Sequence, residues 1–283
     1  MAPAGVATVR TPLEPSALEA AFRGADVVVH LAGVTRAVRP QTYTDVNVEG
    51  ARAVATAARQ VGARLIYISS LAAAGPAPAG APRHEDDPPD PITPYGRSKL
   101  AGEGVVASTS GLRWTILRPA VVYGPGDRAL LPVFRLAERG VLPLLGRPGA
   151  AYTFVHVSDV VRAIDAAIDR RRDGEIFFVG HPLPATAADL IEHIRRVVGR
   201  RALVIRVPRP VVLATAVACD LAGRIAGRTV PLNRSRFAEL SAEGFVCRVD
   251  RLRERLGVVA AVGLADGLAD TAAWYRDAGW LKR

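Results

Sequence analysis

The segment Arg64-Leu-Ile-Tyr-Ile-Ser-Ser70 decides the fold of this chain. Four consecutive apolar residues between an arginine and two serines are typical of a strand that is buried on both faces of a parallel sheet. Similar runs occur at Asp26–Leu31, Arg113–Leu117 and Ile176–Val179, and stretches with helical patterns alternate with them. Such alternation predicts an α/β fold with right-handed crossovers. The helical stretches cover residues 43–61, 93–107 and 158–169.

Several polar or flexible positions follow the strands directly. In sheets of this type, ligands bind beyond the carboxyl ends of the strands. Ser69 and Ser70 lie at one such end. Gly33 follows the first strand, and Pro119 follows the third. We therefore expect these four positions to border one ligand site.

Tyr95 and Lys99 form a candidate catalytic pair. Only two of the 37 basic residues are lysines, Lys99 and Lys282, and a compact ammonium is not interchangeable with a guanidinium. Positions i and i+4 of a helix share a face, and a nearby ammonium lowers the pKa of a phenol. A tyrosine tuned in this way can transfer a proton at a carbonyl or alcohol oxygen, where Ser70 would place a second hydroxyl. The alternative is that this Y-x-x-x-K spacing arises by chance.

The composition argues against several other classes of protein. The formal net charge is +10, but the arginines are scattered, with their densest cluster at 170–172 and no interleaved aromatic residues. We therefore expect no nucleic-acid binding, and the charge would rather attract an anionic cofactor. Cys219 and Cys247 are far apart, and no histidines have the spacing of metal ligands. The isolated cysteines predict buried free thiols in a reducing compartment. The spacing of the histidines predicts no metal site.

Membrane insertion is also not expected. No run of eighteen or more apolar residues occurs. The longest apolar run, Val207–Ala218, is interrupted by two prolines and Arg209, so we interpret it as a buried or surface-docked helix, with weak membrane contact as the alternative. The first five residues lack the basic flank and apolar core of a signal peptide, which predicts a cytoplasmic protein.

The pattern changes from about Pro182 onward. Helical patterns at 187–198, 211–225, 248–256 and 264–275 are interrupted by one strand-like run, Leu203–Val207. They predict a smaller, mostly helical region packed at the carboxyl edge of the sheet. The acidic, proline-rich stretch 83–91 predicts a solvated loop, with a lid over the substrate as the alternative. Ser158 and Asp159 are candidate N-caps of the helix at 158–169.

Together, these segments resemble the extended short-chain dehydrogenase/reductase family, the NAD-dependent epimerase/dehydratase group. The resemblance covers nearly the whole chain. Its C-terminal third is most similar to the branch of the 3β-hydroxysteroid dehydrogenases and dihydroflavonol reductases. The segments that carry it are Asp26-Val-Val-Val-His-Leu-Ala-Gly33, Asp45-Val-Asn-Val-Glu-Gly50, Ile68–Gly75, the Tyr95 and Lys99 pair, Leu117–Asp127 and Phe154–Asp159.

The resemblance implies a site, a cofactor and a domain division. The catalytic residues would be Ser70, Tyr95 and Lys99, and the cofactor NAD or NADP. Residues 1–122 with about 154–181 would form the dinucleotide-binding Rossmann domain, and 123–153 with 182–283 the substrate-binding region. The family also implies a homodimer formed through the helices at 43–61 and 93–107. The cofactor-binding residues would be Leu31, Ala32, Gly33, Asn47, Ser69, Tyr95, Lys99, Pro119, Ala120 and Val121.

The implied activity is oxidation or reduction of a secondary alcohol or ketone in a small-molecule substrate. Sugar 4,6-dehydratases of the family carry an acidic pair after the catalytic hydroxyl, whereas Leu71 and Ala72 follow Ser70 here. A nucleotide-sugar epimerase is the alternative, although the asparagine that would hold the diphosphate beside Pro119–Val121 is missing. The alternative from another class is a non-catalytic remnant or binding module that has lost cofactor binding.

The largest departure from the family is the lack of a G-x-x-G-x-x-G loop. The run Gly5–Arg10 resembles the third strand of the family, and Pro12 stands where an aspartate near the adenine is usual. We therefore expect a Rossmann-like sheet without its first two strands, whose Asp26 strand has an unpaired edge. An internal start at Met1 is the favoured explanation, and a degenerate remnant or a completing partner chain are the others. The residue that distinguishes NAD from NADP belongs to the missing part.

Overall fold

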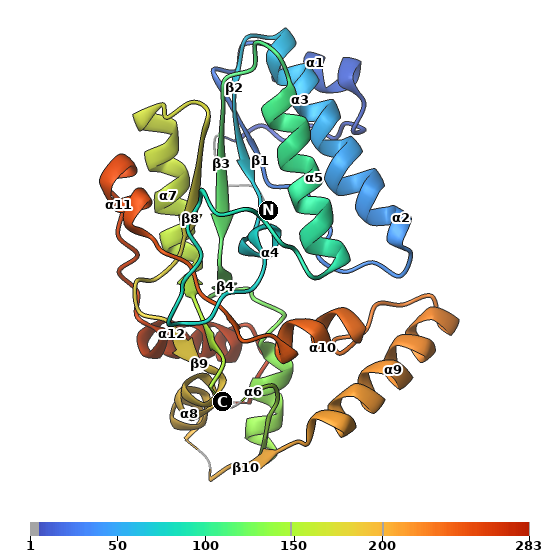
Figure 1. The fold of residues 1–283 in the computed structure, drawn as a ribbon, viewed down its shortest axis with the longest axis vertical. Helices are drawn as coiled ribbons and strands as arrows, with labels where there is room; N and C mark the ends of the chain where they lie inside the picture. Colours follow the sequence, from blue (N-terminus) through green and yellow to red (C-terminus); the bar gives the residue numbers. More distant parts are fainter. Residues whose placement is uncertain (1–5, 148, 200, 283) are drawn as a thin grey trace.

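The computed structural model describes residues 6–147, 149–199 and 201–282. At its centre is a parallel sheet with the strand order β1-β2-β3-β8 (Figure 1). Its strands match the four apolar runs of the sequence to within two residues at each end, so the predicted α/β fold with a Rossmann-like parallel sheet is confirmed. They are β1 (Val27–His30), β2 (Arg64–Ile68), β3 (Trp114–Pro119) and β8 (Glu175–Val179).

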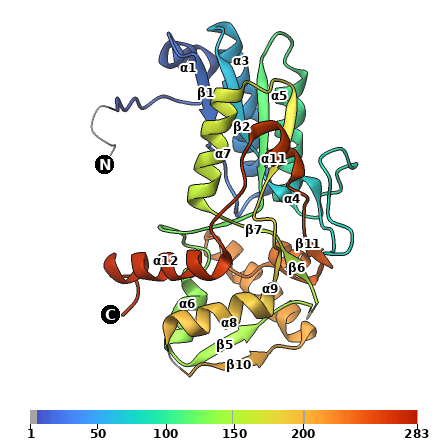
Figure 2. The same ribbon diagram turned by 90° about the vertical axis from the view of Figure 1, so that its left-hand side faces the viewer.

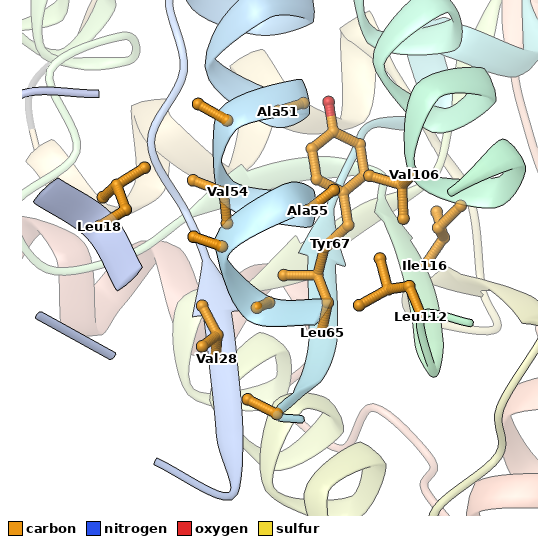
Figure 3. Close-up of a cluster of buried hydrophobic side chains, with 14 residues drawn as sticks. Leu18, Val28, Ala51, Val54, Ala55, Leu65, Tyr67, Val106, Leu112 and Ile116 are labelled. Carbon is orange, nitrogen blue, oxygen red and sulfur yellow. The ribbon is translucent and has the colours of Figure 1, made fainter. Parts of the chain in front are cut away.

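Helices cover both faces of this sheet. The helices around it are α1 (Pro15–Phe22), α2 (Pro40–Tyr43), the π-helix η1 (Thr44–Glu49), α3 (Gly50–Gln60), α5 (Pro94–Ser108), α7 (Val157–Arg170) and α11 (Asp250–Leu256). Leu65 and Tyr67 of β2 pack in the layer of α3 and α5, which Figure 3 shows in detail. Ile66, between them, packs on the opposite face with α7. Successive side chains of a strand point to opposite faces, so a continuous apolar run supplies both layers.

A second layer of structure lies beyond the carboxyl ends of the strands (Figure 2). As expected, helices dominate it, and the strand predicted at Leu203–Val207 is confirmed as β10. Strand pairings that the sequence did not reveal hold the layer together: β4 with β7, β5 with β10, and β6 with β9 and β11. The helices are α4 (Leu71–Ala74), α6 (Leu131–Glu138), α8 (Ala187–Val198), α9 (Arg209–Ile225), α10 (Arg234–Ser241) and α12 (Leu264–Asp277). The strands are β4 (Val121–Tyr123), β5 (Val141–Leu144), β6 (Ala151–Tyr152), β7 (Phe154–His156), β9 (Ala185–Thr186), β10 (Leu203–Arg206) and β11 (Gly244–Phe245).

The N-terminal side of the sheet differs in one respect from the prediction. β1 is an edge strand of the four-stranded sheet, as expected. The strand predicted at Gly5–Arg10 is wrong for the residues described: residues 6–10 are exposed and form no strand, and Gly5 lies outside the described part. A strand needs a neighbour for its backbone hydrogen bonds, and no described segment pairs with this one.

Two helices begin or continue differently from the prediction. The helix predicted at 43–61 is α2 and α3 joined by the π-helix η1, which contains Asn47. Helix α7 begins at Val157 after His156, so Ser158 and Asp159 are not its N-cap. Asp159 instead accepts hydrogen bonds from Arg162 and from the backbone N–H of Val262 at 3.0 Å. A carboxylate in the first turn also interacts favourably with the helix dipole.

The acidic stretch 83–91 is neither a freely solvated loop nor a lid over the cavity described below. Glu85 is buried and accepts a hydrogen bond from the backbone N–H of Phe178 at 3.0 Å. Arg83 forms a β-bridge with Cys247. Cys247 is a buried free thiol as predicted, whereas Cys219 is only half-buried. None of the helices in the described ranges is long and apolar enough to span a membrane.

Candidate active site

Ser70 and Tyr95 come from two helix starts that face each other. Ser70 is the N-cap of α4, where its hydroxyl accepts a hydrogen bond from the N–H of Ala72 at 3.2 Å. Thr93 caps α5 in the same way by accepting from the N–H of Gly96 at 3.1 Å, so Tyr95 lies in the first turn. A side-chain oxygen at the N-cap satisfies an otherwise unpaired backbone N–H, which fixes where each helix starts.

Gly96 permits the close approach of these two helices. A Cβ atom at this position would lie 2.3 Å from the carbonyl oxygen of Ala72 in α4. No larger residue fits without moving the backbone of one helix. The absence of a side chain therefore brings the end of β2 and the start of α5 together, and with them the two predicted hydroxyl groups.

Ser70 and Tyr95 both line a cavity of about 190 Å³. Burial raises the pKa of Tyr95, and a side-chain hydrogen bond with Ser70 opposes that rise. The phenol is therefore kept protonated at neutral pH. The remaining lining is mostly apolar and comes from Leu71, Ala72, Ala120, Val121, Tyr152 and Phe245, with Arg236 and Glu239 of α10 as the charged members.

Lys99 lies on the same face of α5, one turn after Tyr95, and is buried. Its ammonium donates a hydrogen bond to the carbonyl oxygen of Ile68 at 2.7 Å and lies 4.5 Å from the centre of the Tyr67 ring. Burial lowers the pKa of Lys99 to about 8, against the opposing charge of Glu103. The prediction that Lys99 lowers the pKa of Tyr95 is wrong for this geometry, because the ammonium is directed at Ile68 and Tyr67 while burial raises the phenol's pKa.

Asn47 connects the turn after β1 to α5. Its amide accepts from the N–H of Val34 at 2.9 Å and donates to the carbonyl of Val34 at 3.0 Å and to the hydroxyl of Ser98 at 2.8 Å. Gly33 lies next to Asn47 and Lys99: a Cβ atom at Gly33 would be 3.2 Å from the side-chain oxygen of Asn47 and 3.8 Å from the ammonium nitrogen of Lys99. Leu31, Ala32 and Gly33 are exposed. The structure thus brings this turn, Asn47 and Lys99 together.

The other predicted cofactor positions divide into two groups. Ala120 and Val121 border the cavity next to Ser70 and Tyr95, and Pro119 precedes them as the buried last residue of β3. Ser69 is turned inward instead. Its buried hydroxyl donates to the carboxylate of Glu103, so its side chain does not border the cavity.

Glu103 and Arg118, which the sequence did not reveal as part of the site, form a buried ion pair next to it. Glu103 accepts from Arg118 of β3 at 2.9 Å and 2.6 Å, and both side chains are buried. The spacing offered one signal: Tyr95, Lys99 and Glu103 are four residues apart, so they share one face of α5. The sequence offered no signal for Arg118, because the partner of a charged residue inside an apolar strand is set by tertiary contacts.

The exposed turn after β1 fits one half of a dinucleotide. A glycine at position 33 leaves room for a close approach, and the Lys99 ammonium and the Asn47 amide lie just behind it. The Ser70 and Tyr95 hydroxyls are in the neighbouring cavity. For the pyrophosphate half, the chain has no glycine-rich loop of the G-x-x-G-x-x-G type. The residues present therefore fit the nicotinamide and its ribose, and no pyrophosphate loop can be assigned.

Comparison with known proteins points to one family. The family model "NAD dependent epimerase/dehydratase family" matches residues 9–180. A ceramide reductase of Caulobacter vibrioides is 32% identical over 95% of this chain and 80% of its own length. A 3beta-hydroxysteroid-dehydrogenase/decarboxylase of Arabidopsis thaliana is 27% identical over 88% of this chain and 62% of its own length. Among solved structures, MoeE5 in complex with UDP-glucuronic acid and NAD is 26% identical with a TM-score of 0.75, covering 95% of this chain and 85% of MoeE5.

The parallel sheet, the order of the motifs along the chain and these similarities agree with the resemblance seen in the sequence. The chain belongs to the NAD-dependent epimerase/dehydratase family, the extended short-chain dehydrogenases/reductases.

Proposed function

We propose that this chain catalyses the NAD(P)-dependent oxidation or reduction of a secondary alcohol or ketone in an apolar substrate. The observation that carries the proposal is the cavity in which the hydroxyls of Ser70 and Tyr95 meet among largely apolar side chains. Two hydroxyls in an apolar pocket can hold one carbonyl or alcohol oxygen, while the lining takes up the hydrocarbon around it.

Tyr95 is the proton-transfer group in this proposal. Burial keeps its phenol protonated, so in the direction of reduction it donates its proton to the substrate oxygen. Ser70 donates a second hydrogen bond to the same oxygen and so stabilises the charge that develops there. The bound nicotinamide would supply or accept the hydride. Lys99, with Asn47 behind the Gly33 turn, would hold the ribose.

The substrate class is proposed from the lining of the cavity together with the relatives. Six of the cavity residues other than Ser70 and Tyr95 are apolar or aromatic. Two similar proteins carry names that refer to lipids, a ceramide reductase and a 3beta-hydroxysteroid dehydrogenase. A long-chain or polycyclic alcohol or ketone is therefore the proposed substrate.

A nucleotide-sugar epimerase is the second candidate. The similarity to MoeE5, which was solved with UDP-glucuronic acid and NAD, favours it. Arg236 is the one cavity residue that could pair with a phosphate, but it already forms a 3.0 Å ion pair with Glu239. The apolar lining makes this candidate weaker than the oxidoreductase. A homodimer and a cytoplasmic location are part of the proposal for either enzyme.

The experiment begins with fluorescence titrations of NADH and NADPH against the purified chain. Turnover is then measured with ketones of increasing chain length and, in parallel, with UDP-glucuronic acid. We expect saturable dinucleotide binding and ketone reduction that improves with chain length. Epimerised sugar with retained NAD would establish the second candidate instead. A folded sample that binds neither dinucleotide would favour the non-catalytic alternative, in which Ser70, Tyr95 and Lys99 are relics.

A further inference from the structure

Helix α9 exposes a continuous apolar stripe. Val211, Leu221 and Ile225 are 51%, 60% and 81% exposed, and Ala214 and Ala218 between them are also exposed. Their spacing of three, four, three and four residues places all five along one side of the helix. In Figure 1, α9 lies at the edge of the molecule. This stripe differs from an ordinary scatter of single exposed apolar residues because its members are contiguous.

The opposite side of α9 is packed, which fixes the direction of the stripe. Val212, Ala216 and Gly223 are buried. A Cβ at Gly223 would lie 2.7 Å from the carbonyl oxygen of Arg228, in the segment that returns towards α10. These contacts hold the buried side of α9 against the chain, while the stripe lies on the other, exposed side.

The surroundings of the stripe are strongly basic. Residues 206–228, which include α9, contain four arginines and one aspartate, a formal net charge of +3. The single aspartate, Asp220, is half-buried and pairs with Arg224 at 3.3 Å. Exposed arginines stand before the stripe at positions 206 and 209, near its end at position 224, and after it at position 228.

We propose that α9 docks on the surface of a bilayer that contains anionic phospholipids. An apolar stripe flanked by arginines is the pattern of a helix that lies in the plane of the interface, with apolar side chains among the acyl chains and cations at the phosphates. Strand β10, which leads into α9, adds exposed Leu203, Val204 and Ile205. This contact differs from spanning, which no helix in the described residues could do.

Charge argues against a second copy of the chain as the occupant. Two α9 helices packed antiparallel would bring Arg209 of one copy beside Arg224 and Arg228 of the other. Like charges at such an interface repel each other, and no exposed carboxylate of α9 is available to offset them. Phospholipid headgroups supply the opposite charge.

The position of α9 connects this surface to the cavity. Helix α10 follows α9 and packs against it, and its Arg236 and Glu239 line the cavity of Ser70 and Tyr95. A docked α9 would hold this wall of the cavity near the membrane, where apolar substrates accumulate. The docking itself does not depend on the proposed activity, because it is measured without substrate or cofactor.

The test is flotation of the full chain with phosphatidylcholine vesicles that contain or lack phosphatidylglycerol. We expect binding to the vesicles with phosphatidylglycerol, and weaker binding at high salt because salt screens the arginines. The double variant Leu221→Glu/Ile225→Glu should lose tenfold or more in affinity. Leu183→Glu is the matched control: Leu183 is 72% exposed but lies outside α9, so its binding should equal that of the unmodified chain.

An arginine variant tests the contribution of charge to binding, and sedimentation tests whether a second copy of the chain covers α9. Arg209→Glu/Arg228→Glu should also weaken binding, by about fivefold or more for each arginine. Circular dichroism confirms that each variant is folded, and the exposure of all four positions makes unfolding unexpected. No flotation of the unmodified chain, or equal flotation of the stripe variant, overturns the proposal. So does sedimentation showing that the unmodified chain is a dimer and the stripe variant a monomer, since a second copy would then cover α9.

Discussion

Arg118 of β3 donates two hydrogen bonds to the carboxylate of Glu103 in α5, from Nε to Oε1 at 2.9 Å and from Nη2 to Oε2 at 2.6 Å. Both side chains are 4% exposed. The hydroxyl of Ser69 donates to the same carboxylate. This buried pair therefore joins α5 to the carboxyl ends of β2 and β3, where the Tyr95 face of the helix meets Ser70.

Breaking this pair should destabilise the protein strongly. Removing one partner of a buried ion pair leaves an uncompensated charge and costs about 3–5 kcal/mol. We expect this loss in the free energy of unfolding for Arg118→Met, measured by urea denaturation. The control is Arg52→Met, which removes the exposed pair of Arg52 and Glu49 and should cost about 0–1 kcal/mol. Equal losses of unfolding free energy in the two variants would show that the buried pair contributes no more stability than the exposed pair.

Substitution of Gly96 should separate the hydroxyls of Ser70 and Tyr95. Gly96→Ala places a Cβ 2.3 Å from the Ala72 carbonyl, so α4 and α5 must move apart and both stability and turnover should fall. Gly104→Ala is the matched control on the same helix, because a Cβ there meets nothing within 4 Å. It should be neutral or stabilising by up to about 1 kcal/mol, since alanine is the better helix former. Thermal unfolding of both variants decides the point, and a Gly96→Ala protein as stable as Gly104→Ala would contradict the close packing.

Lys99 should make stability depend on alkaline pH. Its pKa is lowered from 10.5 to about 8 in the folded chain, so between these values the unfolded chain binds more protons. The free energy of unfolding should therefore rise with pH in this window, relative to Lys99→Met, by on the order of 3 kcal/mol at most. Urea denaturation of both proteins between pH 7.5 and about 10 measures the difference. If the difference in unfolding free energy between the two proteins did not change with pH, the Lys99 ammonium would not be desolvated.

The same pKa can be observed directly. Lys99 and Lys282 are the two lysines of the chain, so isotopic labelling of lysine gives two sets of side-chain signals, which Lys282→Arg assigns. We expect the Lys99 signal to titrate near pH 8. A Lys99 signal that is unchanged below pH 10 would contradict the burial of its ammonium.

Removal of the Tyr95 hydroxyl should abolish most of the proposed activity with little effect on folding. Loss of a general acid typically costs about 10²–10⁴-fold in rate, so the turnover of Tyr95→Phe should fall by that factor. Tyr275→Phe is the control, because it removes a hydroxyl that donates to the Asp127 carbonyl at 2.6 Å, outside the cavity. This control should lose about 1 kcal/mol of stability and keep its turnover. Steady-state kinetics with the best ketone separates the two, and unchanged turnover in Tyr95→Phe would end the assignment.

Much of the fold was accessible from local patterns. The four apolar runs became the four strands of the sheet, and the predicted helix 187–198 is α8 to the residue. The predicted strand Leu203–Val207 became β10. Its pairing with β5, and the pairing of β4 with β7, were not accessible, because they join short segments far apart in the sequence. Propensity is weak for strands of two to four residues, whose stability comes from their partners.

The sequence by itself determined the strand end at Ser70 and the shared helix face of Tyr95 and Lys99. These local features predict one site, because a parallel sheet gathers its strand ends at one edge. Only the tertiary structure decided their electrostatics. The direction of the Lys99 ammonium towards Ile68, the raised pKa of Tyr95 and the buried pair of Glu103 and Arg118 all depend on desolvation. Desolvation is set by what packs around a group from distant parts of the chain, and no local pattern encodes it.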